Sequence, residues 1–119
     1  MGWLDEKIDE LDNPGAPVAT SRALNASFKP SVTKFTLAMY TIQFACTDGQ
    51  VASVELRSDA VDPPTTVRAS ARLDVAGTAA VQTSRQQLTY IVPKDHFVSL
   101  VSAGTGTPTI AHQTETVIS

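Results

Sequence analysis

The sequence contains few of the residues that build redox, metal or membrane-spanning structures. Its 119 residues include one cysteine and two histidines, which excludes an intramolecular disulfide and a cysteine-rich zinc site. No apolar run approaches the ~18 residues that a membrane-spanning helix requires. The N-terminus MGWLDEKIDE is acidic where a secretory signal is basic and then apolar. We therefore expect a protein that stays in the cytoplasm or joins something assembled there.

Positive charge is also scarce. Nine lysines and arginines stand against twelve acidic residues, the formal net charge is −3, and no window is rich in Lys or Arg. This balance argues against a nucleic acid as partner, and we expect no membrane partner either. A chain of this length makes one domain with a modest core.

Aromatic residues are few, which limits the core. The chain has one tryptophan, two tyrosines and four phenylalanines, and many of the apolar positions between residues 67 and 81 are alanine or valine. At ~25 cal/mol per Å² of buried apolar surface, the free energy that such a body gains by burial is little more than the entropic cost of ordering its chain. Self-association would add buried surface, so we expect an oligomer, with a homotrimer as the specific prediction.

The N-terminal region predicts one short amphipathic helix followed by an extended arm. Within residues 3–11, Leu4, Ile8 and Leu11 share one side with Trp3 beside them, and the acidic residues fall largely on the other. Asn13-Pro14-Gly15 ends the helix, and the Pro-, Ala- and Ser-rich stretch after it is typical of an arm. So short a helix needs a surface to pack on. That surface is either the body of the chain or another protein.

We expect residues 1–24 to form this helix and arm, which anchor the protein, and residues 25–119 to form a β-body. The partner-anchoring residues would be the apolar side chains of the helix: Trp3, Leu4, Ile8 and Leu11.

From Thr33 onward the pattern is that of strands. In residues 67–74, VRASARLD, apolar and polar residues alternate, and they alternate again in residues 51–58. Thr47-Asp48-Gly49 predicts a hairpin that joins residues 35–46 to the strand after it. In residues 35–46 the apolar residues change parity near Met39, so either both faces are covered or a bulge lies there.

Further strands are predicted at 79–83, 86–92, 96–102 and 109–118, the last after a joint formed by residues 104–108. Short strands at spacings of about ten residues without a second helical pattern indicate an all-β fold. We predict an antiparallel sandwich or jelly roll, preceded by the short helix and the arm.

Residues suited to chemistry are isolated from one another. His96 and His112 are sixteen residues apart on different predicted strands, and no HxH or HxxxH spacing is present. The sequence lacks the glycine motifs of phosphate binding and of serine hydrolases. Cys46 lies in an apolar run and is predicted to be a buried, unreactive thiol. We expect no catalytic residue, no metal and no cofactor, and no enzymatic activity.

The charged residues of the body have ordinary structural interpretations. The aspartates at 48, 59, 62 and 74 fall at predicted turns, where Asp bonds its own backbone; calcium bound by Asp59 and Asp62 is the alternative. The arginines at 57, 68, 72 and 85 are expected to pair with Glu55 and Asp74 across strands, the alternative being a role in binding carboxylates or sugars.

Two long stretches carry a resemblance. Residues 54–77, VELRSDAVDPPTTVRASARLDVAG, and the later QQLTYIVPKDHFVSLVSAGTGTPTIAHQTETVI are similar to a family of small virion-associated proteins of tailed bacteriophages and prophages. The similarity covers roughly residues 22–119. The sequence departs from the family pattern at Lys94-Asp95, where a glycine is expected, and this predicts a longer turn before His96.

The resemblance implies a virion protein without enzymatic activity. The first hypothesis is a trimeric accessory subunit that binds phage capsid or tail proteins through its arm, either as a capsid decoration (cement) protein or as a small tail or fibre-tip component. The alternative is a jelly-roll module that binds a receptor or a carbohydrate. Such a module needs exposed aromatic residues, and the candidates are Trp3, Tyr40, Tyr90 and Phe97.

Overall fold

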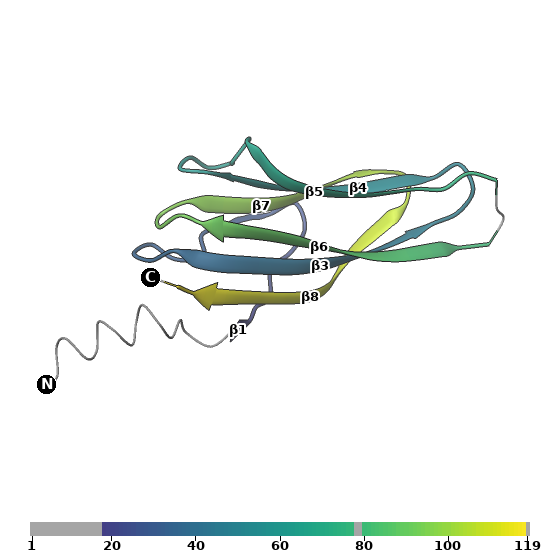
Figure 1. Cartoon of the computed structure of the whole chain (residues 1–119). Helices are drawn as coiled ribbons and strands as arrows, with labels where there is room; N and C mark the ends of the chain where they lie inside the picture. Colours follow the sequence, from purple (N-terminus) through teal and green to yellow (C-terminus); the bar gives the residue numbers. More distant parts are fainter. Residues whose placement is uncertain (1–17, 78–79, 119) are drawn as a thin grey trace, which may run out of the picture.

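The computed structural model describes residues 18–77 and 80–118, and within these ranges the chain forms two antiparallel sheets of four strands each. This confirms the predicted all-β class. Figure 1 shows the two sheets lying face to face. The strands are β1 (Val18–Ala19), β2 (Ser27–Phe28), β3 (Thr36–Cys46), β4 (Val51–Asp59), β5 (Val67–Asp74), β6 (Gln82–Val92), β7 (Phe97–Gly104) and β8 (Thr107–Val117).

The strand pairing is nested. One sheet, sheet A, has the order β1-β8-β3-β6, and the other, sheet B, has the order β2-β7-β4-β5. The first strand therefore pairs with the eighth, the second with the seventh, the third with the sixth and the fourth with the fifth. Of these pairs only β4 and β5 are consecutive in the chain. All of the remaining connections pass from one sheet to the other.

One core fills the space between the sheets. Along β3 and β4 every second residue is buried, as period-two side-chain direction requires. The largest fully buried side chains come from both sheets: Tyr40, Ile42, Phe44 and Leu88 from sheet A, and Leu56 and Leu100 from sheet B. The inward positions predicted for Val54 and Leu56 are confirmed. Cys46 is a free, buried cysteine, also as predicted.

The predicted hairpin of residues 35–46 with the following strand is wrong. β3 pairs with β6 and β8, whereas β4 pairs with β5 and β7, so the turn at Thr47-Asp48-Gly49 joins the two sheets. The turn chemistry itself was correctly identified, because Gly49 has a φ of 79°. A tight turn fixes a reversal of direction but not the sheet that the next strand enters.

Two details of the strands also differ from prediction. The runs 79–83 and 86–92 were predicted as separate strands, but β6 is continuous from Gln82 to Val92. Of the two alternatives for residues 35–46, covered faces or a bulge near Met39, the bulge is wrong, because β3 alternates without interruption. The register shifts on the β8 side instead, between the partners of Thr41 and Ile42.

The body has two distinct ends. The connections β2–β3, β4–β5 and β6–β7 share one end with the close of β8, which we call the terminal end; for example, Asp95 N–H donates to Ser31 O (2.9 Å). The connections β3–β4, β5–β6 and β7–β8 lie at the opposite end, where Gly49 N–H donates to Val75 O (2.9 Å). Figure 1 shows the terminal end on the left.

Candidate functional site

The predicted anchoring residues Trp3, Leu4, Ile8 and Leu11 lie outside the described residues. Their role stays a prediction, as does the division of the chain at residue 24. The described part of the arm begins at Val18, which pairs with Glu115 of β8. The site built below is therefore the junction of arm and body, together with the surface around it.

A buried ion pair fastens the arm to the body. Arg22 donates two hydrogen bonds to the Glu115 carboxylate, from Nε (2.9 Å) and Nη2 (2.8 Å), and Tyr40 Oη donates a third to Glu115 Oε2 (2.9 Å). Glu115 is only 6% exposed, and Tyr40 is fully buried. A two-pronged guanidinium–carboxylate pair of this kind fixes orientation as well as charge.

The surroundings of this cluster raise the pKa values of Tyr40 and Arg22. Burial, and after it the negative charge of Glu115, raise the pKa of the Tyr40 phenol far above its ordinary value. The hydrogen bond to Glu115 raises the pKa of Arg22. Tyr40 therefore stays protonated at neutral pH and donates its hydrogen bond to Glu115.

Gln113, two residues before Glu115 on β8, holds the backbone of the arm. Its Oε1 accepts from Arg22 N–H (2.6 Å) and from Thr20 Oγ1 (3.1 Å), while its Nε2 donates to Arg22 O (3.3 Å). The side-chain amide thus satisfies both backbone groups of Arg22, as a neighbouring strand would. We call Arg22, Tyr40, Gln113 and Glu115 the arm clamp.

The chain after the clamp is held to sheet B. Asn25 has a φ of 62° and exchanges two hydrogen bonds with Ser102, at 2.9 and 3.0 Å. Phe28 lies under the Arg22 guanidinium, with 4.4 Å between Cζ and the ring centroid, and packs edge-on against Tyr40. We call the described chain from Val18 to Phe28 the arm root. The arm root therefore contacts both sheets.

Exposed apolar side chains gather at the terminal end. In the described ranges, six of the seven large apolar side chains that remain exposed belong to its connections or to the strand residues beside them: Val32, Phe35, Val61, Val67, Ile91 and Val117. The seventh, Val81, lies at the opposite end. Scattered exposed apolar residues are ordinary on a protein surface, but an accumulation at one end indicates a contact surface.

The outer face of sheet A continues this surface. Phe35, Leu37 and Met39 follow one another at alternate positions of the β3 run, on the side away from the core, and Ile91 of β6 is the register partner of Leu37. Ile91 is 52% exposed, and Leu37 and Met39 are half-buried. We call these four residues the outer-face patch. Farther along the same face the surface is polar, where Arg85 Nε donates to Gln43 Oε1 (2.9 Å).

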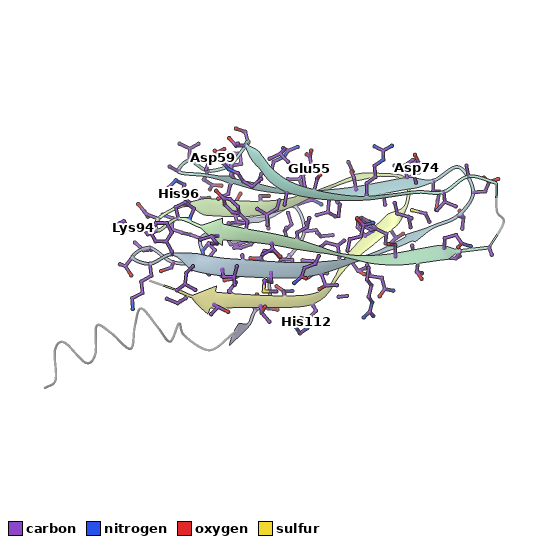
Figure 2. All side chains as sticks on the ribbon, viewed as in Figure 1. Glu55, Asp59, Asp74, Lys94, His96 and His112 are labelled. Atoms are coloured by element: carbon purple, nitrogen blue, oxygen red, sulfur yellow. The ribbon has the colours of Figure 1, made fainter. Side chains whose placement is uncertain are left out.

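The histidines do not converge. Figure 2 shows His96 in the β6–β7 connection at the terminal end and His112 on β8, pointing away from the body. Nδ1 of His96 lies 3.0 Å from Lys94 O. Among residues 18–77 and 80–118, no group of three His, Cys, Asp or Glu side chains could hold a metal ion. An open hollow of about 500 Å³ at the opposite end is lined by Leu73–Ala76, Gln82 and Thr83, and it contains no pair of catalytic groups.

Asp59 is a turn residue, as predicted. Its Oδ2 accepts the N–H groups of Thr65 (2.6 Å) and Thr66 (2.8 Å), which orders the β4–β5 connection. Hydrogen bonds from Thr66 and Thr65 hold the pKa of the Asp59 carboxyl well below its usual range. The carboxylate is thus occupied by its own loop, whereas the calcium alternative would need it free.

Asp59 predicts a loss of stability in acid. Because its pKa is lower in the folded than in the unfolded chain, its contribution is complete above the unfolded value of about 4 and declines as the pH falls below it. Urea unfolding at pH 7 should show Asp59→Asn to be less stable than the wild type, and the difference should shrink by pH 2.5. A difference that is the same at both pH values would contradict this account.

The arginines mostly pair with acids, although not always across strands. Arg57 contacts Glu55 (2.7 Å) and Arg72 contacts Asp74 (3.5 Å), each two residues along its own strand. Arg85 donates to Gln43 instead of to an acid. The strongest pair, Arg22 with Glu115, was missed. The available signal was a glutamate, Glu115, at an inward position of the last strand. That position can be recognised as inward only when the register of β8 is known.

The aromatic candidates for ligand binding are already engaged within the chain. Tyr40 is in the core, Tyr90 has Arg68 over its ring (5.8 Å from Cζ to the centroid), and Phe97 has Lys29 Nζ over its ring (4.5 Å). Trp3 lies outside the described residues. These contacts do not favour a carbohydrate platform.

Comparisons with known proteins add no relative. No family model, no curated protein and no solved structure matches the chain. Within the described residues, no helix is long and apolar enough to cross a membrane.

Proposed function

We propose that this chain is a structural, non-enzymatic subunit of a tailed-bacteriophage virion, a homotrimer attached through its N-terminal arm. It would serve as a capsid decoration (cement) protein or as a small tail or fibre-tip component, and it would reach the virion during assembly in the host cytoplasm. The observation that carries the proposal is the terminal end, where six of the seven large exposed apolar side chains of the described ranges gather.

The direction of the arm supports this assignment. Because β1 is antiparallel to β8, with Val18 opposite Glu115 and Ala19 opposite Thr114, the N-terminal end of β1 faces the terminal end. The arm clamp fixes the position of β1 through partly buried hydrogen bonds from Arg22 to Glu115. An anchor that leaves the body beside an apolar surface allows both to bind the same partner.

The nested strand pairing supports the finer fold assignment. Pairing of strands one with eight, two with seven, three with six and four with five is the pattern of a long hairpin wrapped into two sheets. We infer an eight-stranded jelly roll, an architecture used by viral capsid proteins and by lectins. Since a fold does not determine a function, the virion role depends on the terminal end and on the family resemblance.

A trimer would cover part of the exposed apolar surface. The described core is rich in small side chains, with Ala38, Ala52 and Ala71 among its buried members. A modest core leaves little stability in reserve, and burial between subunits adds to it. The alternative of a receptor- or carbohydrate-binding module has no comparable observation in its favour, because Tyr40, Tyr90 and Phe97 are occupied.

The direct test counts the protein in particles. Virions made by the phage or prophage that encodes this chain should contain it in many copies per particle, measured by quantitative mass spectrometry after gradient purification. A chain that is expressed during infection but absent from purified virions would overturn the proposal.

A double substitution in the arm should abolish incorporation while leaving the body intact. Leu4→Asp with Ile8→Asp places two charges on the apolar side of the helical segment, and charged groups are strongly disfavoured in an apolar contact. Light scattering should still give about three times the mass of 12.6 kDa, and the variant should be missing from virions. Asp5→Asn with Asp9→Asn, on the acidic side, is the matched control and should be incorporated. Normal incorporation of the Leu4/Ile8 variant would contradict anchoring by these residues.

A further inference from the structure

We propose that residues 3–11 dock on the outer-face patch of their own chain in the free subunit. The patch is formed by Phe35, Leu37, Met39 and Ile91, and the segment would place its apolar side on it. We call this docked arrangement the latch. The latch is independent of the proposed virion role, whereas release of the segment from the patch on assembly rests on that role.

The size of the patch fits the segment. A nine-residue helix is about 13 Å long, and the four residue steps from Phe35 to Met39 span about 13 Å of strand. The patch is two strands wide, since Leu37 and Ile91 are register partners on β3 and β6. The apolar side of the segment consists of Leu4, Ile8 and Leu11 with Trp3 beside them. A short helix of this kind gains most of its stability from such packing.

The position of the arm root brings the segment within reach. Val18 lies in β1, two strand positions from β3, a separation of about 10 Å across the sheet. Residues 12–17 can span about 20 Å when extended. The N-terminal end of β1 faces the terminal end, so a docked segment would need a turn before β1 to lie over the outer face. Asn13-Pro14-Gly15 supplies a turn sequence at the right place.

Charge favours the same arrangement. The polar side of the segment carries Asp5, Glu6, Asp9 and Glu10. Lys34 immediately precedes Phe35, and Lys94 follows Ile91 by three residues; both lysines are exposed. Figure 2 places Lys94 at the terminal end. Both lysines lie at the terminal-end side of the patch, so a docked segment would have two basic positions next to its acidic side at that end.

The linker decides between the same chain and a neighbouring one. A linker of six residues gives a local concentration in the millimolar range, well above a working protein concentration in the micromolar range. If docking on the patch of the same chain and docking on the patch of another copy are equally favourable contacts, docking within the same chain therefore predominates. The free subunit would thus shield part of its own apolar surface, and the virion would have to offer the segment a better site.

Trp3 is the single tryptophan of the chain, so its fluorescence reports the latch directly. In the full-length wild type, Trp3 should emit at short wavelength and resist quenching by acrylamide. Leu37→Thr with Ile91→Thr removes apolar surface while keeping good strand formers. In this variant the emission should shift to longer wavelength and quenching should increase. Gln43→Thr with Arg85→Thr is the matched control, a register pair on the same strands and the same face, and it should behave as the wild type does.

A second variant guards against a folding defect in the body. Leu4→Asp with Ile8→Asp changes only the segment and should expose Trp3 to the same extent as the patch variant does. If Trp3 is equally quenched in the wild type and in both variants, the latch is overturned. The proposed virion role would then still stand, because incorporation is measured separately.

A mixing experiment separates docking within the chain from exchange between copies. The Leu37→Thr/Ile91→Thr variant is refolded from urea with an excess of Trp3→Phe protein, which offers intact patches but no signal. Trp3 should stay exposed if docking is intramolecular. Protection of Trp3 in the mixture would show that segments bind neighbouring copies, and it would overturn the intramolecular latch.

Discussion

Replacement of Glu115 by alanine is expected to lower the free energy of unfolding by about 3 kcal/mol, because removing one partner of a buried ion pair leaves the other uncompensated. Arg22 and Tyr40 would both lose their acceptor, although Arg22 is partly exposed and water would solvate it in part. Urea unfolding of the full-length protein measures the loss.

Glu55→Ala is the matched control for Glu115→Ala. Glu55 also pairs with an arginine, at 2.7 Å from Arg57, but both side chains are about one third exposed. Exposed pairs of this kind contribute about 0–1 kcal/mol. Tyr40→Phe removes only one of the three hydrogen bonds to Glu115 and should cost about 1 kcal/mol. Equal losses for Glu115→Ala and Glu55→Ala would contradict the structural role of the arm clamp.

Substitution of Gly104 by alanine should be similarly damaging, for a different reason. Gly104 closes β7 with a φ of 99°, which L-residues rarely adopt, and an added Cβ would collide with the backbone carbonyl oxygen of Val51. Strain at such a position costs about 1–3 kcal/mol, and relief of the collision requires β4 to move. We expect a loss of about 3 kcal/mol or more, or failure to fold.

Gly49→Ala separates these two effects. Gly49 also has a positive φ, of 79°, but its added Cβ would meet nothing within 4 Å. It should therefore show the backbone strain alone, about 1 kcal/mol. Thermal unfolding of the two variants in parallel makes the comparison. If Gly49→Ala were as destabilised as Gly104→Ala, the collision with Val51 would not be the cause.

The sequence predicted strands well and their partners poorly. Alternation in 51–58 and 67–74 correctly identified strands, because side-chain direction in a strand is a local property. The hairpin between β3 and β4 was wrong, because the choice of sheet depends on pairings with β6, β7 and β8 far away in the chain. The apolar Phe35, Leu37 and Met39 left two alternatives open, a bulge or apolar residues on both faces, and they form an apolar outer face.

The candidate site was predictable in part for the same reason. The amphipathic pattern of residues 3–11 is local and could be read directly, but Arg22 and Glu115 are 93 positions apart and each resembles an ordinary surface charge. At Asp95 the family pattern predicted a longer turn. Asp95 instead adopts the conformation that glycine would have, with a φ of 62°, and its side chain is held by Lys29 at 2.7 Å.

The nested pairing also determines the order in which the chain can fold during synthesis. Only β4 and β5 are local partners, so this hairpin can form as soon as both have left the ribosome. Each outer pair must then wait for a more distant strand, and pairing between distant segments is slow. Arg22 meets Glu115 only after β8 has been made. The contacts between the arm root and β8 are thus the last to form. Until then, the apolar segment of residues 3–11 is attached to a body that has not completed its folding.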